Sequence, residues 1–183
     1  MKNKNATVGI FLQSFKYFVN VQNDLKNNIT FPRNIVTNAA VLLQNLTSKH
    51  LRDPQFLDDK GGVSPGSRPV NLIGIHVRRG DMTRDDKQQY GNNVAPASYF
   101  NKSMIYLEAK LQSVHIVYLI FTDDVQWSVD NVMSLRPNNS VLVSNFTNNN
   151  YLTDFYLLTR CNHVIMSVGT FGWWGAYLAG AYL

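Results

Sequence analysis

The chain of 183 residues has little cysteine, little charge and no long smooth apolar stretch, and each shortage excludes a class of protein. Its single cysteine, Cys161, rules out an internal disulfide. Only 16% of the residues are charged and 45% are hydrophobic, which excludes an intrinsically disordered chain. The longest apolar stretch without charge, residues 164–183, is interrupted by Gly169 and Gly172. We therefore expect a buried strand and helix there, not a transmembrane helix.

Basic residues exceed acidic ones by five, but they are scattered along the chain. The tightest basic group, Arg78, Arg79 and Arg84, is mixed with aspartates and lacks the interleaved aromatic residues of a nucleic-acid binder. We therefore expect no nucleic acid, and either a small anionic ligand or an ordinary basic surface. One cysteine and four dispersed histidines give no zinc-binding spacing.

Asparagine is abundant, and six Asn-X-Ser/Thr sequons occur where composition alone gives about 2.5. The sequons begin at Asn5, Asn28, Asn45, Asn101, Asn138 and Asn145. Their number favours the secretory pathway, whereas the single cysteine favours the cytosol. Residues 1–7 are polar and contain neither a signal peptide nor an anchor. The sequence therefore predicts either a cytosolic protein or a fragment of a longer anchored one.

The first third of the chain is expected to be helical. Apolar spacing predicts one helix over residues 8–29 and a second that begins near Pro32 and reaches Leu46. Residues 53–69 contain three prolines and three glycines, so we expect a linker or domain boundary there.

After this linker, short apolar runs alternate with helical periodicity. Strands are expected at residues 70–77, 116–121, 141–143 and 163–168. Helices are expected at residues 96–111, 125–133, 152–162 and 170–183, the last one capped by Thr170. Alternating strands and helices, with strands that are apolar throughout, indicate an α/β fold built from βαβ units on a parallel sheet. Ligands of such sheets bind at the carboxyl ends of the strands.

Residues 76–81, at the end of the first expected strand, have the composition of an anion site. Strand alternation places His76 and Arg78 on one face and Arg79 on the other. Guanidinium groups pair with phosphate through two hydrogen bonds, and a glycine turn follows them here. The alternative is that one arginine is buried against a carboxylate while the other is solvated. The Arg-Gly-Asp tripeptide within this segment adjoins a buried strand, so it does not indicate an integrin ligand.

Two other strand ends offer polar groups. Asp123 and Asp124 follow the second strand, where carboxylates can hold a metal or a ribose hydroxyl. An acidic pair is also the usual start of a helix, and we favour this interpretation. Gly169 and Thr170 follow the fourth strand at the start of a helix, whose backbone N–H groups and dipole suit a phosphate. Together with the arginines, this turn predicts a diphosphate site.

Several segments together resemble one family. Residues 74–81 (GIHVRRGD), 154–163 (DFYLLTRCNH) and 169–178 (GTFGWWGAYL) are similar to signature segments of the galactoside α1,2-L-fucosyltransferases, glycosyltransferase family 11. Residues 11–18 (FLQSFKYF) and 121–124 (FTDD) resemble further segments of the same family, in the right order.

This resemblance implies a GT-B-type glycosyltransferase with a Rossmann-like, parallel-sheet donor-binding domain. It implies transfer of L-fucose from GDP-fucose to the 2-hydroxyl of a galactose on a glycan acceptor, with inversion and without a metal or other cofactor. Family members are typically single-pass Golgi membrane proteins. A lumenal Golgi location is therefore implied, with membrane contact only through an anchor that this chain lacks.

The resemblance also implies roles for individual residues. The arginine matching Arg78 holds the donor diphosphate, and the residues matching His76 and Asp154 approach the nucleoside. The turn matching Gly169 and Thr170 lies at the phosphates.

Arg79 and Phe171 complete the expected donor-binding set. For catalysis, Arg78 is expected to neutralise the leaving phosphate. Asp81 is the expected general base, with Asp85 and Asp86 as the other candidates.

The domain prediction follows from the same resemblance. The chain lacks most of the family's N-terminal, acceptor-side domain and stops before the family's usual end. We expect residues 1–60 to be a truncated helical remnant of that domain and residues 61–183 to be the GDP-fucose-binding domain, truncated at its C-terminus. Two alternatives stay open: a catalytically incomplete GDP-sugar-binding fragment, and a fucosyltransferase with a different glycan or protein acceptor.

Overall fold

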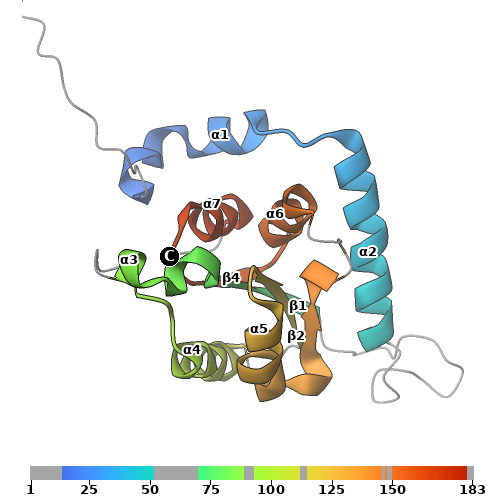
Figure 1. Ribbon diagram of the computed structural model, residues 1–183. Helices are drawn as coiled ribbons and strands as arrows, with labels where there is room; N and C mark the ends of the chain where they lie inside the picture. Colours follow the sequence, from blue (N-terminus) through green and yellow to red (C-terminus); the bar gives the residue numbers. More distant parts are fainter. Residues whose placement is uncertain are drawn as a thin grey trace, which may run out of the picture. The chain divides into compact units, whose positions relative to one another are not determined.

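The computed structural model describes residues 14–51, 70–88, 93–111, 115–145, 147 and 150–180. Contacts divide the chain into two compact units, Met1–Thr30 and Phe31–Leu183. In the first unit, the 3-10 turns η1 (Phe15–Tyr17) and η2 (Val19–Val21) precede helix α1 (Gln22–Asn28) (Figure 1).

The prediction of one continuous helix over residues 8–29 is wrong for the part that the structure describes. Residues 15–21 form two separate 3-10 turns, and the α-helix begins only at Gln22. This segment is rich in aromatic and β-branched side chains, which lose rotational freedom in an α-helix. Phe11, another residue of the predicted apolar spacing, lies outside the described residues.

The second unit contains the alternating strands and helices that the sequence predicts. In chain order its elements are α2 (Arg33–Leu51), β1 (Val70–Val77), η4 (Gly80–Thr83), α3 (Asp85–Gln88), α4 (Ala97–Lys110), β2 (His115–Thr122), α5 (Val125–Asn131), η5 (Met133–Leu135), η6 (Pro137–Asn139), β3 (Ser140–Leu142), η7 (Val143–Asn145), α6 (Tyr151–Thr159), β4 (His163–Met166) and α7 (Thr170–Ala179). The α/β fold class is confirmed.

The four described strands form one parallel sheet in the order β3-β2-β1-β4. β1 pairs with β2 in a register that runs from Val70 opposite His115 to Val77 opposite Thr122. The chain proceeds outward from β1 to β2 and β3, then returns to place β4 on the other side of β1. This is the strand order of a Rossmann-like sheet, and β1 and β4 border the point where the order reverses.

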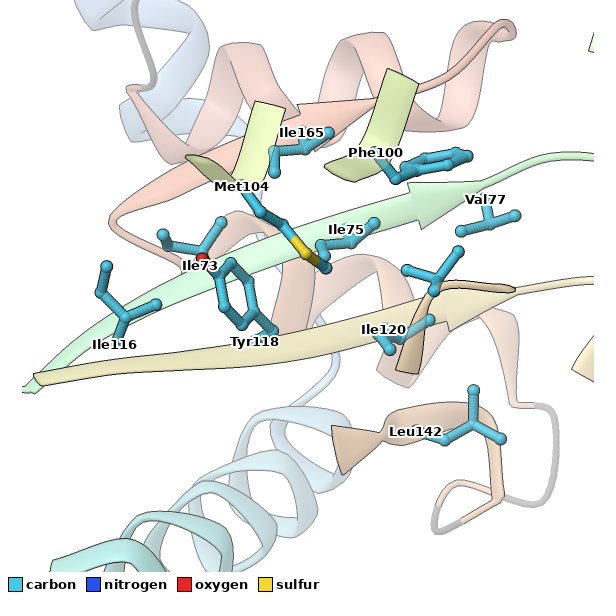
Figure 2. Close-up of a cluster of buried hydrophobic side chains, with 11 residues drawn as sticks. Ile73, Ile75, Val77, Phe100, Met104, Ile116, Tyr118, Ile120, Leu142 and Ile165 are labelled. Atoms are coloured by element: carbon cyan, nitrogen blue, oxygen red, sulfur yellow. The ribbon is translucent and has the colours of Figure 1, made fainter. Parts of the chain in front are cut away.

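Helices α4 and α5 cover one face of the sheet (Figure 1). Alternate residues of β1 and β2 point into this layer, where Phe100 and Met104 of α4 pack against them (Figure 2). These strand residues are Ile73, Ile75, Val77, Ile116, Tyr118 and Ile120. The helix predicted over residues 96–111 is therefore confirmed as α4.

Helices α2, α6 and α7 pack on the opposite face. Leu158 of α6 fills the space beside two glycines there. A Cβ at Gly74 of β1 would lie 2.6 Å from Leu158 Cδ1, and one at Gly175 of α7 would lie 2.4 Å from Leu158 Cδ2. The absence of side chains at both positions therefore allows α6 and α7 to approach the sheet closely.

Helix α2 contributes Ala39 and Leu46 to the core on this second face. It thus packs with the sheet in the compact unit that begins at Phe31. The predicted division between residues 60 and 61 falls among residues 52–69, which lie outside the described residues, and stays a prediction. None of the described helices is both long and apolar enough to cross a membrane.

The start and end of α7 correct the predicted last helix. Gly169 occupies the N-cap position, and Thr170, the predicted cap, is the first helical residue. The helix ends at Ala179 because Gly180 adopts the left-handed conformation, with φ +78°. Residues 181–183 lie outside the described residues.

The packing of Leu158 predicts coupled stability effects. Gly175→Ala should cost about 1–3 kcal/mol of unfolding free energy because its methyl group overlaps Leu158. Leu158→Ala should cost about 2–5 kcal/mol through the cavity it leaves. In the double variant the new methyl group occupies part of that cavity, so the combined cost should be below the sum by about 1 kcal/mol. Chemical denaturation of all four proteins measures this, and simple additivity would contradict the packing.

Candidate anion site at the carboxyl ends of the strands

The ends of β1 and β4 are joined by hydrogen bonds at one edge of the sheet. The backbone N–H of Arg78, directly after β1, donates to Ser167 Oγ at 2.8 Å. The backbone N–H of Ser167, directly after β4, donates to the carbonyl of His76 at 3.1 Å. These bonds hold the predicted anion-binding segments side by side.

The guanidinium of Arg78 lies between two carboxylates. Its Nη1 donates to Asp123 Oδ2, and its Nη2 donates to Asp81 Oδ1. Asp123 Oδ1 also accepts from the backbone N–H groups of Arg79, at 2.8 Å, and Gly80, at 3.2 Å. A Cβ at Gly80 would lie 2.6 Å from Asp123 Oδ2, so glycine is needed for this close approach.

Arg79 lies on the opposite face from Arg78, as strand alternation predicts. Its Nε donates to Asp124 Oδ2 at 3.2 Å, and its Cζ lies 3.9 Å from the centre of the Trp127 ring. Asp124 also accepts from the backbone N–H of Trp127 as the N-cap of α5, which confirms the helix-start interpretation for this residue. These contacts account for Arg79 structurally, and its role in binding a ligand stays a prediction.

Asp123 is the residue that sequence reasoning missed. It was interpreted with Asp124 as a helix start, yet its carboxylate binds Arg78 and the turn after β1. The contact between Asp123 and Arg78 follows from the register in which β1 pairs with β2. His76 lies opposite Phe121, so continuing the pairing by two residues places Arg78 opposite Asp123. Local sequence patterns do not contain that register.

His76 is buried, with 5% of its surface exposed. Its ring stacks on Phe171 of α7 at a centroid distance of 5.4 Å, and a Cβ at Gly172 would lie 2.4 Å from Nδ1. Burial lowers the pKa of His76 to about 4, with Asp123 opposing this shift and Arg78 adding to it. The imidazole is therefore uncharged at neutral pH.

Ser167 contacts this imidazole. Its Oγ accepts from the backbone N–H of Arg78 and lies 3.4 Å from His76 Nδ1. One hydroxyl thus joins the turn after β1 to the buried ring.

The turn between β4 and α7 runs beside Arg78. Gly169 has φ +111° and ψ 156°, a conformation restricted to glycine, and a Cβ there would lie 4.0 Å from Arg78 Cγ. Thr170 begins α7 at this point, so the positive end of the helix dipole lies near the arginine. The structure thus brings together Arg78, Gly169 and Thr170, which the sequence predicted to form one site.

Asp154 lies on the β3 side of the same edge of the sheet. Its carboxylate accepts from Thr147 Oγ1 at 2.6 Å and lies 3.4 Å from Ser144 Oγ, which is also 3.2 Å from the carbonyl of Thr122. Burial raises the pKa of Asp154, and the two hydroxyl groups partly offset this shift. These contacts attach α6 to the ends of β2 and β3. A nucleoside contact of Asp154 stays a prediction.

Of the three candidate bases, Asp81 contacts Arg78, whereas Asp86 pairs with Arg84 at 3.2 Å. Asp85 is exposed at the start of α3. Within the residues that the structure describes, no three His, Cys, Asp or Glu side chains are grouped to hold a metal ion.

Comparisons with family models and with known proteins point to the same family. The family model described as glycosyl transferase family 11 matches residues 15–182. Galactoside alpha-(1,2)-fucosyltransferase 2 of Oryctolagus cuniculus is 36% identical over 131 residues, which cover 72% of this chain and 36% of that protein. The enzyme of the same name from Bos taurus is 33% identical over 142 residues, 77% of this chain and 40% of that protein. Galactoside 2-alpha-L-fucosyltransferase SEC1 of Bos taurus is 34% identical over 142 residues, 77% of this chain and 38% of that protein. The chain therefore spans less than half the length of these relatives.

The buried His76 predicts an acid-sensitive fold. Its pKa is about 4 when folded and 6.5 when unfolded, so the unfolded state binds more protons between these values. Stability should be fully present above pH 6.5 and fall by up to about 3 kcal/mol as the pH drops to 4. Denaturation at several pH values should show a shallower slope in this range for His76→Gln. Equal slopes for the parent and His76→Gln would contradict the prediction.

The backbone conformation of Gly169 predicts that its substitution lowers the unfolding free energy more than substitution of Gly180 does. Gly169→Ala should cost about 1–3 kcal/mol because φ +111° with ψ 156° is restricted to glycine. Gly180, in the ordinary left-handed region, should accept alanine at about 1 kcal/mol and asparagine at less. Thermal or chemical unfolding measures the order, and an equal or smaller cost at Gly169 would refute this conformation.

Proposed function

The chain belongs to glycosyltransferase family 11, and on this premise we propose that it binds GDP-L-fucose at the strand-end site and transfers fucose to the 2-hydroxyl of a galactose on a glycan. The observation that supports the proposal best is the position of Arg78 beside Gly169, where β1 and β4 border the reversal of strand order. This is where sheets of this type bind nucleotides.

The groups at this point suit a diphosphate. The Arg78 guanidinium offers charged N–H donors, which suit phosphate oxygens. Gly169 has no side chain to keep a phosphate away from the backbone, and the start of α7 provides a positive dipole end.

The buried, uncharged ring of His76 stacks on Phe171 next to Arg78. Phe155 packs edge-on against Phe171 at 5.1 Å and keeps that ring in place. An uncharged His76 does not add a second positive charge beside the arginine, which is consistent with one anionic group and a neutral nucleoside or sugar binding here.

The proposed reaction exchanges one bond at C1 of fucose. The galactose 2-hydroxyl oxygen attacks C1 as the bond from C1 to the β-phosphate oxygen breaks, which inverts the configuration and releases GDP. The hydroxyl proton passes to a base, for which Asp81 is the proposed residue. Arg78 and the start of α7 stabilise the negative charge that grows on the β-phosphate, so the proposal needs no metal or other cofactor.

We place the reaction in the lumen of the Golgi, by kinship with the family. The sequons support a secretory route, and the asparagines of three of them, Asn28, Asn45 and Asn138, are exposed.

Arg78→Ala should weaken GDP binding by tenfold or more, because a charge-assisted hydrogen bond to phosphate is lost (about 1.5–3 kcal/mol). Isothermal titration calorimetry of the parent and the variant with GDP, GDP-fucose and ADP measures this. Arg84→Ala is the matched control, since Arg84 is 67% exposed and pairs with Asp86 rather than with the site. The parent should prefer GDP to ADP.

A transfer assay with GDP-fucose and galactose-terminated acceptors separates the proposed activity from its alternatives. Fucose on the galactose 2-hydroxyl supports the proposal. GDP binding without transfer to any acceptor would indicate a binding fragment, and transfer only to another glycan or to protein would indicate a different acceptor. A folded parent chain that binds neither GDP nor GDP-fucose would contradict the site assignment.

A further inference from the structure

The anion site is formally negative before a ligand enters. Its charged side chains are Arg78, Arg79, Asp81, Asp123 and Asp124, two positive and three negative. Arg79 and Asp124 pair with each other against α5, which leaves one arginine between two carboxylates. An anionic ligand that binds Arg78 must therefore displace a carboxylate or approach both of them.

Asp123 is held firmly. Beyond its ion pair with Arg78, its second oxygen accepts two backbone N–H groups, from Arg79 and Gly80. It follows directly after β2, next to the paired end of β1, and its side chain is 27% exposed. Moving it would break three interactions at once.

Asp81 is held weakly. It lies in the short 3-10 turn η4, three residues after Arg78, and its side chain is 41% exposed. Among the described residues, its carboxylate pairs with Arg78 alone. Displacing it breaks a single exposed ion pair, the weakest kind of charge interaction in a protein.

We propose that Asp123 is the positioning residue that holds Arg78 for the donor, and that Asp81 occupies the guanidinium edge that the donor diphosphate takes over. This inference rests on the proposed function for the identity of the diphosphate. Nη1 of Arg78 keeps its hydrogen bond to Asp123, and Nη2 exchanges the Asp81 carboxylate for a phosphate oxygen.

The exchange has a consequence for catalysis. While Asp81 is paired with Arg78, its Oδ1 accepts from the guanidinium and is not available to the acceptor hydroxyl. Release by the diphosphate would free Asp81 to take the proton of the acceptor hydroxyl. Binding of the donor would thus make the base available only when a leaving group is in place.

Neutralising Asp81 and neutralising Asp123 should change the affinity for GDP in opposite directions. Asp81→Asn removes the competitor of the diphosphate and should tighten GDP binding about two- to fivefold. Asp123→Asn leaves an acceptor for the backbone but turns its amide toward Arg78, and should weaken GDP binding on the order of tenfold. Calorimetry with GDP and, separately, inorganic pyrophosphate measures both. Asp86→Asn, which removes a charge from the same region without contacting Arg78, should change affinity less than either.

A second variant displaces Asp123 without changing any charge. Gly80→Ala places a methyl group 2.6 Å from Asp123 Oδ2 and should weaken GDP and pyrophosphate binding as Asp123→Asn does. Circular dichroism and chemical denaturation identify any variant that fails to fold. In a transfer assay, Asp81→Asn should lower kcat despite its tighter GDP binding, which a merely structural role would not produce.

The outcomes separate this inference from the proposed function. If GDP binds and fucose is transferred, but both asparagine variants shift GDP affinity in the same direction, the exchange is wrong and the function stands. If pyrophosphate binds with opposite shifts but GDP binds no more tightly than pyrophosphate, the exchange holds and the nucleotide-sugar function is wrong. If the folded parent binds neither anion, the exchange is overturned.

Discussion

The parallel pairing of β1 with β2 on one side and β4 on the other is the constraint on which the candidate site depends. It brings the carboxyl ends of these strands to one edge, so that Arg78, Asp123 and Ser167 meet although they are far apart in the sequence. The hydrogen bonds of Arg78 and Ser167 continue the contact between β1 and β4 beyond the last paired residues. The sheet therefore fixes the backbone of Arg78 and Ser167, whereas the Asp81 side chain in η4 is held by its ion pair with Arg78.

Side chains alternate between the two faces of β1, so successive residues have different surroundings. On one face, Val77 enters the core under α4 and Arg79 packs on α5. On the other, Gly74 admits Leu158 and His76 stacks under α7. One arginine of the pair thus supports the fold while the other faces the site. The hypothesis of a single buried arginine was half right, since both arginines pair with carboxylates and neither is simply solvated.

Much of this fold follows from local sequence, and the site follows only in part. Strand β1 has its predicted bounds, because a continuous apolar run is a strong signal for a buried parallel strand. Residues 15–21 were mistaken for a helix because apolar spacing ignores the low helix propensity of their side chains. The Asp123 contact depends on strand register, and the contact of His76 with Gly172 depends on how α7 lies on the sheet. Neither is a local property of the sequence.

The proposed function requires a guanosine diphosphate to bind between the end of β1 and the start of α7. Amide NMR of the 15N-labelled chain during a GDP titration locates the bound nucleotide. Binding at this point should give saturable shifts centred on the amides of Gly80, Gly169 and Phe171, with little change around Arg136, whose ion pair with Glu108 connects other elements. Saturable shifts centred on Arg136, or no shifts at a GDP concentration far above that of the protein, would contradict it.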